Sequence, residues 1–154
     1  MSGIVRWGRR SAALVLVAAV ASVAALSASA TVTGGAKVKI RTTSLGRVVV
    51  NAGGRTLYLF EKDKHGKSAC YGACAQYWPP LLTRGKPIAG AGVKAKLLGV
   101  TMRRNGTHQV TYAGHPLYRY VVDTRAGQTT GEGSTLFGAG WDALAPSGKK
   151  IESS

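Results

Sequence analysis

Two aspartates follow pairs of aromatic residues at the same spacing in two segments of the chain. The segments are Tyr58-Leu59-Phe60-Glu61-Lys62-Asp63 and Tyr118-Arg119-Tyr120-Val121-Val122-Asp123. Residues two apart lie on one face of a strand, so each aromatic pair shares a face and each aspartate lies just past a strand end. If the fold brings Asp63 and Asp123 together, they can form an acid/base pair or bind a cationic ligand.

A structural role for the same residues is the alternative, and we favour it. A buried tyrosine needs a partner for its hydroxyl, and an aspartate at a strand end can accept that hydrogen bond or cap the donors of a turn. The sequence does not give the separation of the two carboxylates. The motif residues, structural or ligand-binding, are Tyr58, Phe60, Asp63, Tyr118, Tyr120 and Asp123.

The chain has only two cysteines, Cys70 and Cys74. On a helical turn, residues four apart have Cα atoms about 6 Å apart, which a disulfide can span. We therefore predict a disulfide. So short a loop contributes only about 2 kcal/mol by constraining the unfolded chain, so its task is to fix the segment that leads to Trp78. The spacing is neither the redox pattern Cys-x-x-Cys nor the haem pattern Cys-x-x-Cys-His.

The histidines offer weak candidates for a metal site. His65 lies two residues from Asp63, and His115 lies three residues before Tyr118. This spacing matches no established ligand pattern, and we interpret the histidines as surface residues in loops. The weak candidates for metal ligands are His65, His115, Asp63 and Asp123. No serine lies in a nucleophile elbow and no glycine-rich stretch matches a phosphate loop, so we predict no catalytic residue and no cofactor.

Alternating apolar residues and turn dipeptides predict a mainly β fold that positions these residues. A short strand is expected at 38–41. Residues 48–50 and 56–60 flank Asn51-Ala52-Gly53-Gly54 and predict a hairpin. Residues 100–103 and 109–112 flank Asn105-Gly106 and predict a second hairpin, which continues as a meander into 116–122.

The intervening segments contain little regular structure. Residues 68–78 have modest helical character, and Pro79-Pro80 ends a helix at Trp78 or just before it. Residues 83–93 and 127–140 are rich in glycine or proline and are predicted as loops, and 141–144 as one edge strand.

An internal repeat organises the chain. Residues 54–63 align with residues 114–123 without a gap, 60 positions apart, and a Trp segment follows each copy. We predict two pseudo-symmetric β-hairpin/meander repeats, at about 48–82 and 97–146. Neither repeat has enough apolar residues for its own core, so the two are expected to pack as one small domain, residues 38–146, with a short helical segment near the cysteines.

The N-terminal 30 residues have the order of a signal peptide. Arg6, Arg9 and Arg10 precede the apolar run from Ala12 to Leu26, and Ala28-Ser29-Ala30 supplies small residues for cleavage. The run is shorter than the roughly 20 residues of a spanning helix, so an uncleaved anchor is the lesser alternative. Residues 31–37 are predicted as a flexible linker and residues 147–154 as a tail.

The chain is strongly basic, with 21 Lys plus Arg and 6 Asp plus Glu. Removal of residues 1–30 leaves 18 basic and 6 acidic residues, a net charge of +12. Export makes a nucleic-acid partner improbable, and anionic wall polymers or envelope proteins are the expected partners. A membrane contact is expected only through an uncleaved signal peptide. The basic residues are scattered, so a merely solvated basic surface is the simpler interpretation.

The ordered set of motifs resembles a family of secreted repeat proteins of the bacterial envelope, predicted lipoproteins with a Tyr-x-aromatic-x-x-Asp motif. The resemblance covers roughly Val48 to Pro146 and includes the two cysteines, Trp78-Pro79-Pro80-Leu81 and Gln109-Val110-Thr111-Tyr112. No cysteine precedes Cys70, so the lipid-attachment residue of a lipoprotein is absent. The resemblance implies architecture and an extracytoplasmic, envelope-associated location, without an activity.

Three functions follow as hypotheses. The first is a non-catalytic binding or structural module of the cell envelope. The second is a metal-binding or redox-associated periplasmic or extracellular protein that uses Asp63, Asp123 and nearby histidines. The third is a wall-glycan hydrolase that uses the two aspartates as its carboxylate pair.

Overall fold

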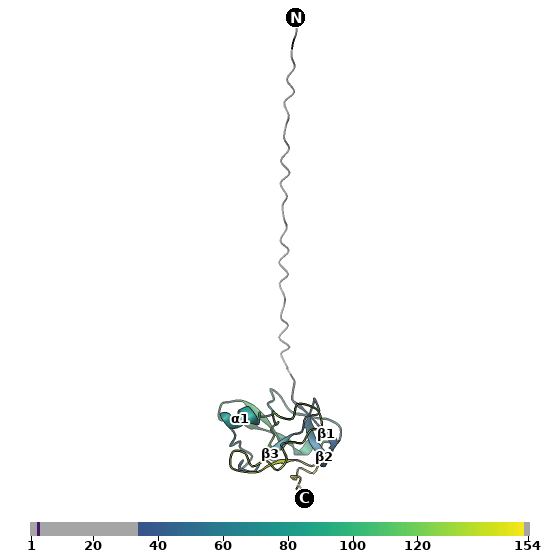
Figure 1. The fold of residues 1–154 in the computed structure, drawn as a ribbon, viewed down its shortest axis with the longest axis vertical. Helices are drawn as coiled ribbons and strands as arrows, with labels where there is room; N and C mark the ends of the chain where they lie inside the picture. Colours follow the sequence, from purple (N-terminus) through teal and green to yellow (C-terminus); the bar gives the residue numbers. More distant parts are fainter. Residues whose placement is uncertain (1–2, 4–33, 153–154) are drawn as a thin grey trace. The chain divides into compact units, whose positions relative to one another are not determined.

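The computed structural model describes Gly3 and residues 34–152 of the chain. Apart from Gly3, the predicted signal peptide lies outside the described residues, as do residues 31–33 of the predicted linker. The fold is mainly β, and Figure 1 shows α1 and the β1–β2 pair on opposite sides of the domain. In chain order the elements are β1 (Lys37–Thr43), β2 (Gly46–Asn51), β3 (Tyr58–Phe60), α1 (Ala73–Tyr77), β4 (Ile88–Ala89), the 3-10 helix η1 (Ala95–Leu97), β5 (Leu98–Met102), β6 (His108–Tyr112), β7 (His115–Pro116) and β8 (Trp141–Ala143).

Three small sheets contain these strands. Their strand orders are β2-β1-β4, β3-β8 and β5-β6-β7. The predicted second hairpin is confirmed, because β5 pairs antiparallel with β6. The meander also forms, since β6 pairs with β7, but β7 ends at Pro116 and the predicted strand does not extend to 122. Gly106 in its turn has φ +80°, a conformation that a side chain disfavours.

The predicted first hairpin is only partly correct. The turn forms, since the Asn51 N–H donates to the Arg55 carbonyl at 2.9 Å. β3, however, leaves β2 beyond Leu57 and pairs antiparallel with β8, while the partner of β2 is β1. Local alternation shows that a strand exists but not which strand lies beside it, so the pairing with a segment 80 residues away escaped the sequence analysis.

Hydrogen bonds repeat between the two halves of the domain. The Leu57 N–H donates to Val49 O at 3.0 Å, and the Leu117 N–H donates to Val110 O at 2.9 Å. At the centre, Tyr58 and Tyr118 exchange backbone hydrogen bonds of 2.9 and 3.0 Å. This reciprocal pair marks an approximate two-fold axis between the repeats.

The Trp segments are exchanged across the same axis. Leu144, which follows β8, accepts the Val49 N–H of the first half at 2.8 Å, and Leu81 accepts the Val110 N–H of the second half at 2.9 Å. Each half thus completes its strand pairing with a segment of the other half. The two repeats form one domain for this reason, as well as for lack of separate cores.

Four aromatic rings form a stack that crosses the axis, in the order Phe60, Trp141, Trp78 and Tyr120. The two indoles lie 3.9 Å apart and 4° from parallel. Phe60 stacks on Trp141 at 4.0 Å, and Tyr120 stacks on Trp78 at 4.2 Å. Both tryptophans are fully buried, so this stack forms the centre of one of the two hydrophobic clusters.

The segments outside the motif strands also depart from the predictions. α1 ends before Trp78, as Pro79 requires, but β4 lies within the predicted loop 83–93 and pairs parallel with β1. β8 is buried at all three residues and is not an edge strand, because Ser134 and Ile151 bond its other side.

The chain beyond each predicted domain boundary is part of the fold. Lys37, assigned to the linker, is the first residue of β1. In the predicted tail, the Ile151 N–H donates to the Ala143 carbonyl at 2.8 Å, which holds that segment against β8.

Replacement of Trp78 by alanine should remove the central contact of the stack and leave a cavity that the flanking rings cannot fill. The expected loss in the free energy of unfolding is about 3–5 kcal/mol, measured by urea denaturation followed by circular dichroism. The adjacent Tyr77 is 49% exposed, so Tyr77→Ala is a matched control with an expected loss of about 0.5 kcal/mol. Equal losses for the two variants would contradict the central role of the stack.

Candidate functional site

The tyrosine of each motif is bonded to the aspartate of the other motif. The Tyr58 hydroxyl donates to Asp123 Oδ2 at 2.6 Å, and the Tyr118 hydroxyl donates to Asp63 Oδ2 at 2.8 Å. The strands place these groups, because the backbone exchange between Tyr58 and Tyr118 directs each motif past the other. A tight turn then positions each aspartate: the Asp63 N–H bonds Phe60 O, and the Asp123 N–H bonds Tyr120 O.

The second oxygen of each carboxylate anchors the following loop. Asp63 Oδ1 accepts the Ala69 N–H at 2.7 Å, and Asp123 Oδ1 accepts the Thr130 N–H at 3.0 Å. Thr130 also donates its hydroxyl to the same oxygen of Asp123. All four carboxylate oxygens therefore have donors from the protein, and no residue among those that the structure describes bonds to both aspartates.

Gly131 permits the close approach at the first pair. Its N–H donates to the Tyr58 hydroxyl at 3.3 Å. A Cβ at this position would lie 2.7 Å from the Trp78 ring and 3.0 Å from the Tyr58 ring. No side chain fits there without displacing the aromatic residues.

Burial changes the protonation of the pairs in a consistent direction. Burial, followed by the hydrogen bond and charge of Asp123, raises the pKa of Tyr58 far above its ordinary value of 10.0. Burial and then the charge of Asp63 raise the pKa of Tyr118 in the same way. Both hydroxyls are therefore protonated donors at neutral pH. Asp123 is fully buried, whereas Asp63 is partly exposed.

The pKa of Asp63 differs from its ordinary value of 3.8. Burial raises it to about 6, although the Ala69 N–H, the Tyr118 hydroxyl and the charge of Arg103 all act in the opposite direction. Asp63 thus titrates within a range that an extracytoplasmic protein can meet.

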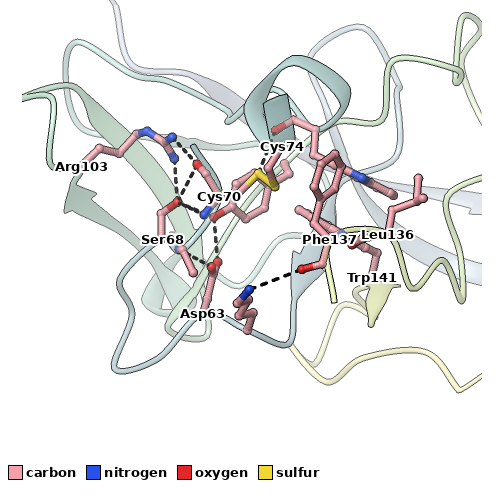
Figure 2. Close-up of a disulfide and its surroundings, with 12 residues drawn as sticks. Asp63, Ser68, Cys70, Cys74, Arg103, Leu136, Phe137 and Trp141 are labelled. Atoms are coloured by element: carbon pink, nitrogen blue, oxygen red, sulfur yellow. Dashed lines mark hydrogen bonds between the residues drawn. A yellow bond between two sulfur atoms is a disulfide. The ribbon is translucent and has the colours of Figure 1, made fainter. Parts of the chain in front are cut away.

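Cys70 and Cys74 form the predicted disulfide, with Cα atoms 5.2 Å apart (Figure 2). Cys70 precedes α1 and is not part of its helical turn. The Trp78 N–H donates to Cys74 O at 2.8 Å, so the cross-linked turn is attached directly to the residue at the centre of the stack. The predicted local task of the disulfide agrees with this contact.

Arg103 is a buried cation that the sequence analysis did not single out. Only 4% of its surface is exposed, and its guanidinium donates to Ser68 Oγ, Gln109 Oε1 and the Cys70 carbonyl at 2.8, 2.7 and 2.7 Å. Ser68 Oγ also lies 2.8 Å from the Tyr118 hydroxyl. Figure 2 shows Ser68 beside the Arg103 guanidinium. Arg103 is thereby linked to the second Tyr–Asp pair through one serine.

Tyr71 lies between two guanidinium groups. The Cζ atoms of Arg103 and Arg104 are 4.4 and 4.1 Å from the centre of its ring, and the Tyr71 hydroxyl accepts the Arg104 N–H at 3.0 Å. Burial tends to raise the pKa of Tyr71, but these hydrogen bonds and the nearby positive charge outweigh it, and the pKa is lowered. The sequence feature that could have pointed to this cation cluster is the turn dipeptide Asn105-Gly106, because it places Arg103 and Arg104 at the tip of a hairpin.

These residues line a surface depression of about 740 Å³, which we call the basic depression. Lys67 and Arg104 are exposed at its edge. Across residues 34–152 the only ion pair joins Lys150 to Glu61, so no carboxylate forms an ion pair with the cations of the basic depression. Asp63 is near enough for the charge of Arg103 to lower its pKa, but it makes no direct contact with that guanidinium. Its lining residues are Lys67, Ser68, Ala69, Tyr71, Met102, Arg103, Arg104 and Gly106.

A family model described as "Secreted repeat of unknown function" matches residues 39–82 and 99–145 of the chain. Together these two segments contain more than half of its 154 residues. The chain belongs to this family of secreted repeats. Its members are described as secreted, which supports an extracytoplasmic location. No curated protein and no solved structure matches the chain.

The residues proposed as metal ligands do not converge in this secreted repeat protein. His65 and His115 are both exposed, and of the four candidates only His115 and Asp63 line one depression. Among the described residues, no group of three or more His, Cys, Asp or Glu side chains is arranged to hold a metal ion. The part of the chain that the structure describes also contains no helix with the length and hydropathy needed to cross a bilayer.

The geometry argues against the glycan-hydrolase hypothesis. A glycosidase carboxylate must reach the glycosidic oxygen, the anomeric carbon or a water molecule. Asp123 is fully buried and both of its oxygens accept hydrogen bonds from the protein. Asp63 is likewise held by Tyr118 and Ala69. The paired aspartates are positioned to stabilise the fold.

Tyr58→Phe should destabilise the secreted repeat by about 1–3 kcal/mol, because Asp123 Oδ2 would stay buried without its donor. Tyr120→Phe is the matched control: the Tyr120 ring stacks in the same cluster, and no hydrogen bond of its hydroxyl is present in the structure. We expect a change within about 0.5 kcal/mol for this control, measured by chemical denaturation. A loss for Tyr58→Phe no larger than the control's would show that the crossed hydrogen bond is dispensable.

The pH dependence of stability should contain a contribution from Asp63. Because its folded-state pKa is raised from 3.8 to about 6, the fold favours the protonated form, and the free energy of unfolding should fall as pH rises from about 4 to about 6. Two pKa units correspond to at most ~3 kcal/mol, and the partial exposure of Asp63 reduces this to roughly 1–2 kcal/mol.

Asp63→Asn should flatten that part of the profile, as determined from thermal denaturation between pH 4 and pH 7. Other carboxylates titrate in both proteins, so the relevant quantity is the difference between wild type and variant. A difference that does not change with pH would contradict the raised pKa.

Proposed function

We propose that this secreted repeat protein is a non-catalytic module of the cell envelope that binds anionic wall polymers at the basic depression. The observation that carries the proposal is the pair of guanidinium groups of Arg103 and Arg104 packed against the Tyr71 ring without a carboxylate partner. Two like charges placed on the same aromatic ring repel each other, and a bound anion would offset that repulsion.

The depression is organised before a ligand binds. Arg103 is fixed by its hydrogen bonds to Ser68, Gln109 and Cys70, and the disulfide holds the loop that carries Tyr71. Fixed cations lose little conformational entropy when a ligand binds. The exposed edge, formed by Lys67 and Arg104, is the part that can contact a polymer directly.

Phosphate-bearing polymers are the ligand class that this arrangement favours. A guanidinium offers paired N–H donors that match phosphate oxygens. The net charge of +15, or +12 after removal of residues 1–30, concentrates polyanions near the surface. The predicted signal peptide and the absence of a lipid-attachment cysteine concern the location of the protein, which is part of the same proposal. They would release the protein to the wall and leave it without an acyl anchor.

The test compares two double variants that remove equal charge. Binding of the purified protein to inorganic polyphosphate, and to wall fragments with and without their phosphodiester polymers, should weaken about 10-fold or more in Lys67→Ala/Arg104→Ala. The slope of affinity against salt should also decrease. Lys94→Ala/Lys96→Ala removes two exposed lysines outside the depression and should have a smaller effect.

Three outcomes of this comparison decide against the proposal. Equal weakening in both double variants would assign binding to net charge alone. Binding that does not depend on salt would exclude an electrostatic site. The third is a failure of the wild-type protein to bind polyphosphate or intact wall fragments.

A further inference from the structure

The acidic residues are distributed unevenly over this basic protein. The chain has six carboxylate side chains, of which two belong to the Tyr–Asp pairs. The other four gather around Lys150, which lies 2.8 Å from Glu61 Oε1. The hydrogen bond to Glu61, and then the charges of Asp142, Glu61 and Glu152, raise the pKa of Lys150. We call this group the acidic cluster: Glu61, Glu132, Asp142 and Glu152.

Two oxygens of the acidic cluster are buried and have no partner. Glu132 Oε1 and Asp142 Oδ2 accept no hydrogen bond and are closed to solvent. The Asp142 side chain is only 9% exposed. Burial makes the negative charge of each carboxylate unfavourable. For Glu132, repulsion from Asp142 adds to this cost. The charge of Lys150 offsets only part of this cost: it acts to lower the pKa of both carboxylates, but burial keeps both pKa values raised, and the hydrogen bond of Lys150 goes to Glu61.

The strand β8 brings the two carboxylates together. Trp141 and Ala143 face the core, so Asp142 lies on the opposite face of the strand. Glu132 Oε2 accepts the Ala143 N–H at 2.7 Å, which fixes that carboxylate beside the neighbouring residue and leaves Oε1 free. The unpartnered oxygens therefore belong to side chains that a strand and a backbone hydrogen bond hold in position.

Glu61 is held at the same strand by a glycine. The Glu61 N–H donates to Gly140 O at 2.9 Å, and a Cβ on Gly140 would lie 2.6 Å from Glu61 Oε2. The absence of a side chain at residue 140 thus leaves room for a third carboxylate next to β8. A larger residue would push the Glu61 carboxylate away from the strand.

We propose that Glu132 and Asp142, the two carboxylates with unpartnered buried oxygens, form a binding site for a divalent cation, Ca²⁺. Glu61, which is paired with Lys150, is not one of its ligands. A cation would supply the missing partner of both buried oxygens and offset the repulsion between the two carboxylates. Only oxygen donors are present, which favours a hard cation, and Ca²⁺ accepts irregular sets of oxygens that include backbone carbonyls and water. With two carboxylates as the side-chain ligands, we expect an affinity of about 10⁻⁴ to 10⁻³ M, typical of extracellular modules.

The site is separate from the basic depression and does not depend on the polymer-binding proposal. The two sites share no lining residue.

The test is thermal denaturation of the purified protein in CaCl₂, in MgCl₂ and in EDTA, at matched ionic strength and neutral pH, with isothermal titration calorimetry for affinity. The unfolding midpoint of the wild type should rise with Ca²⁺ concentration, because a ligand that binds only the folded state stabilises it. Mg²⁺, which requires a near-ideal octahedron, should have a smaller effect.

Asp142→Asn and Glu132→Gln should each abolish the response to Ca²⁺, and both should retain or raise the midpoint in EDTA because a buried charge is removed. Glu132→Gln keeps an oxygen for the Ala143 N–H, so it tests the site even if the other variant folds poorly. Asp63→Asn is the matched control, a partly buried carboxylate outside the acidic cluster, and should keep the full response.

The proposal is overturned if the wild-type midpoint and heat of titration are the same in Ca²⁺ and EDTA. A rise in stability of Asp142→Asn without any effect of Ca²⁺ on the wild type would show that Asp142 is a buried charge that binds no metal ion. Loss of the response in Asp63→Asn as well would place the ion elsewhere.

Discussion

Tyr58 and Tyr118 exchange backbone hydrogen bonds of 2.9 and 3.0 Å, and the positions of the other motif residues follow from this contact. The exchange sets the two motif strands antiparallel across an approximate two-fold axis, so that each strand runs toward the loop of the other repeat. The tyrosine hydroxyls then meet the opposite aspartates, and Trp78 and Trp141 stack between them. A shift of register at this point would separate both hydrogen-bonded pairs and the stack together.

The two halves diverge where no symmetric contact constrains them. The first half carries the disulfide, and the second carries β8. The basic depression combines Lys67–Tyr71 of the first half with Met102–Gly106 of the second. The acidic cluster combines Glu61 with carboxylates near β8. Asp123 is fully buried, while Asp63 is partly exposed and has a raised pKa. The contacts at the axis are thus the same in both halves, whereas the loops that the aspartates anchor differ and form two different surfaces.

The sequence predicted features that depend on neighbouring residues. The hairpin at Asn105-Gly106, the end of α1 before Pro79 and the Cys70–Cys74 disulfide all follow from local turn chemistry or chain geometry. The pairing of β3 with β8 and the crossed Tyr–Asp bonds did not follow, because they join residues 55 or more positions apart in different repeats. The burial of Arg103 was also missed, since its partners lie in the loop at Ser68–Cys70 and in β6.

The crossed bonds make each copy of the repeat incomplete by itself. An isolated copy would expose its tyrosine, its aspartate and one face of its tryptophan, and two free copies could satisfy all of these only by associating, at a rate and extent that depend on concentration. Joining the copies in one polypeptide makes the association intramolecular, with an effective concentration set by the connecting chain. Dilution into the medium outside a cell, which would dissociate such a dimer, leaves the single-chain form intact.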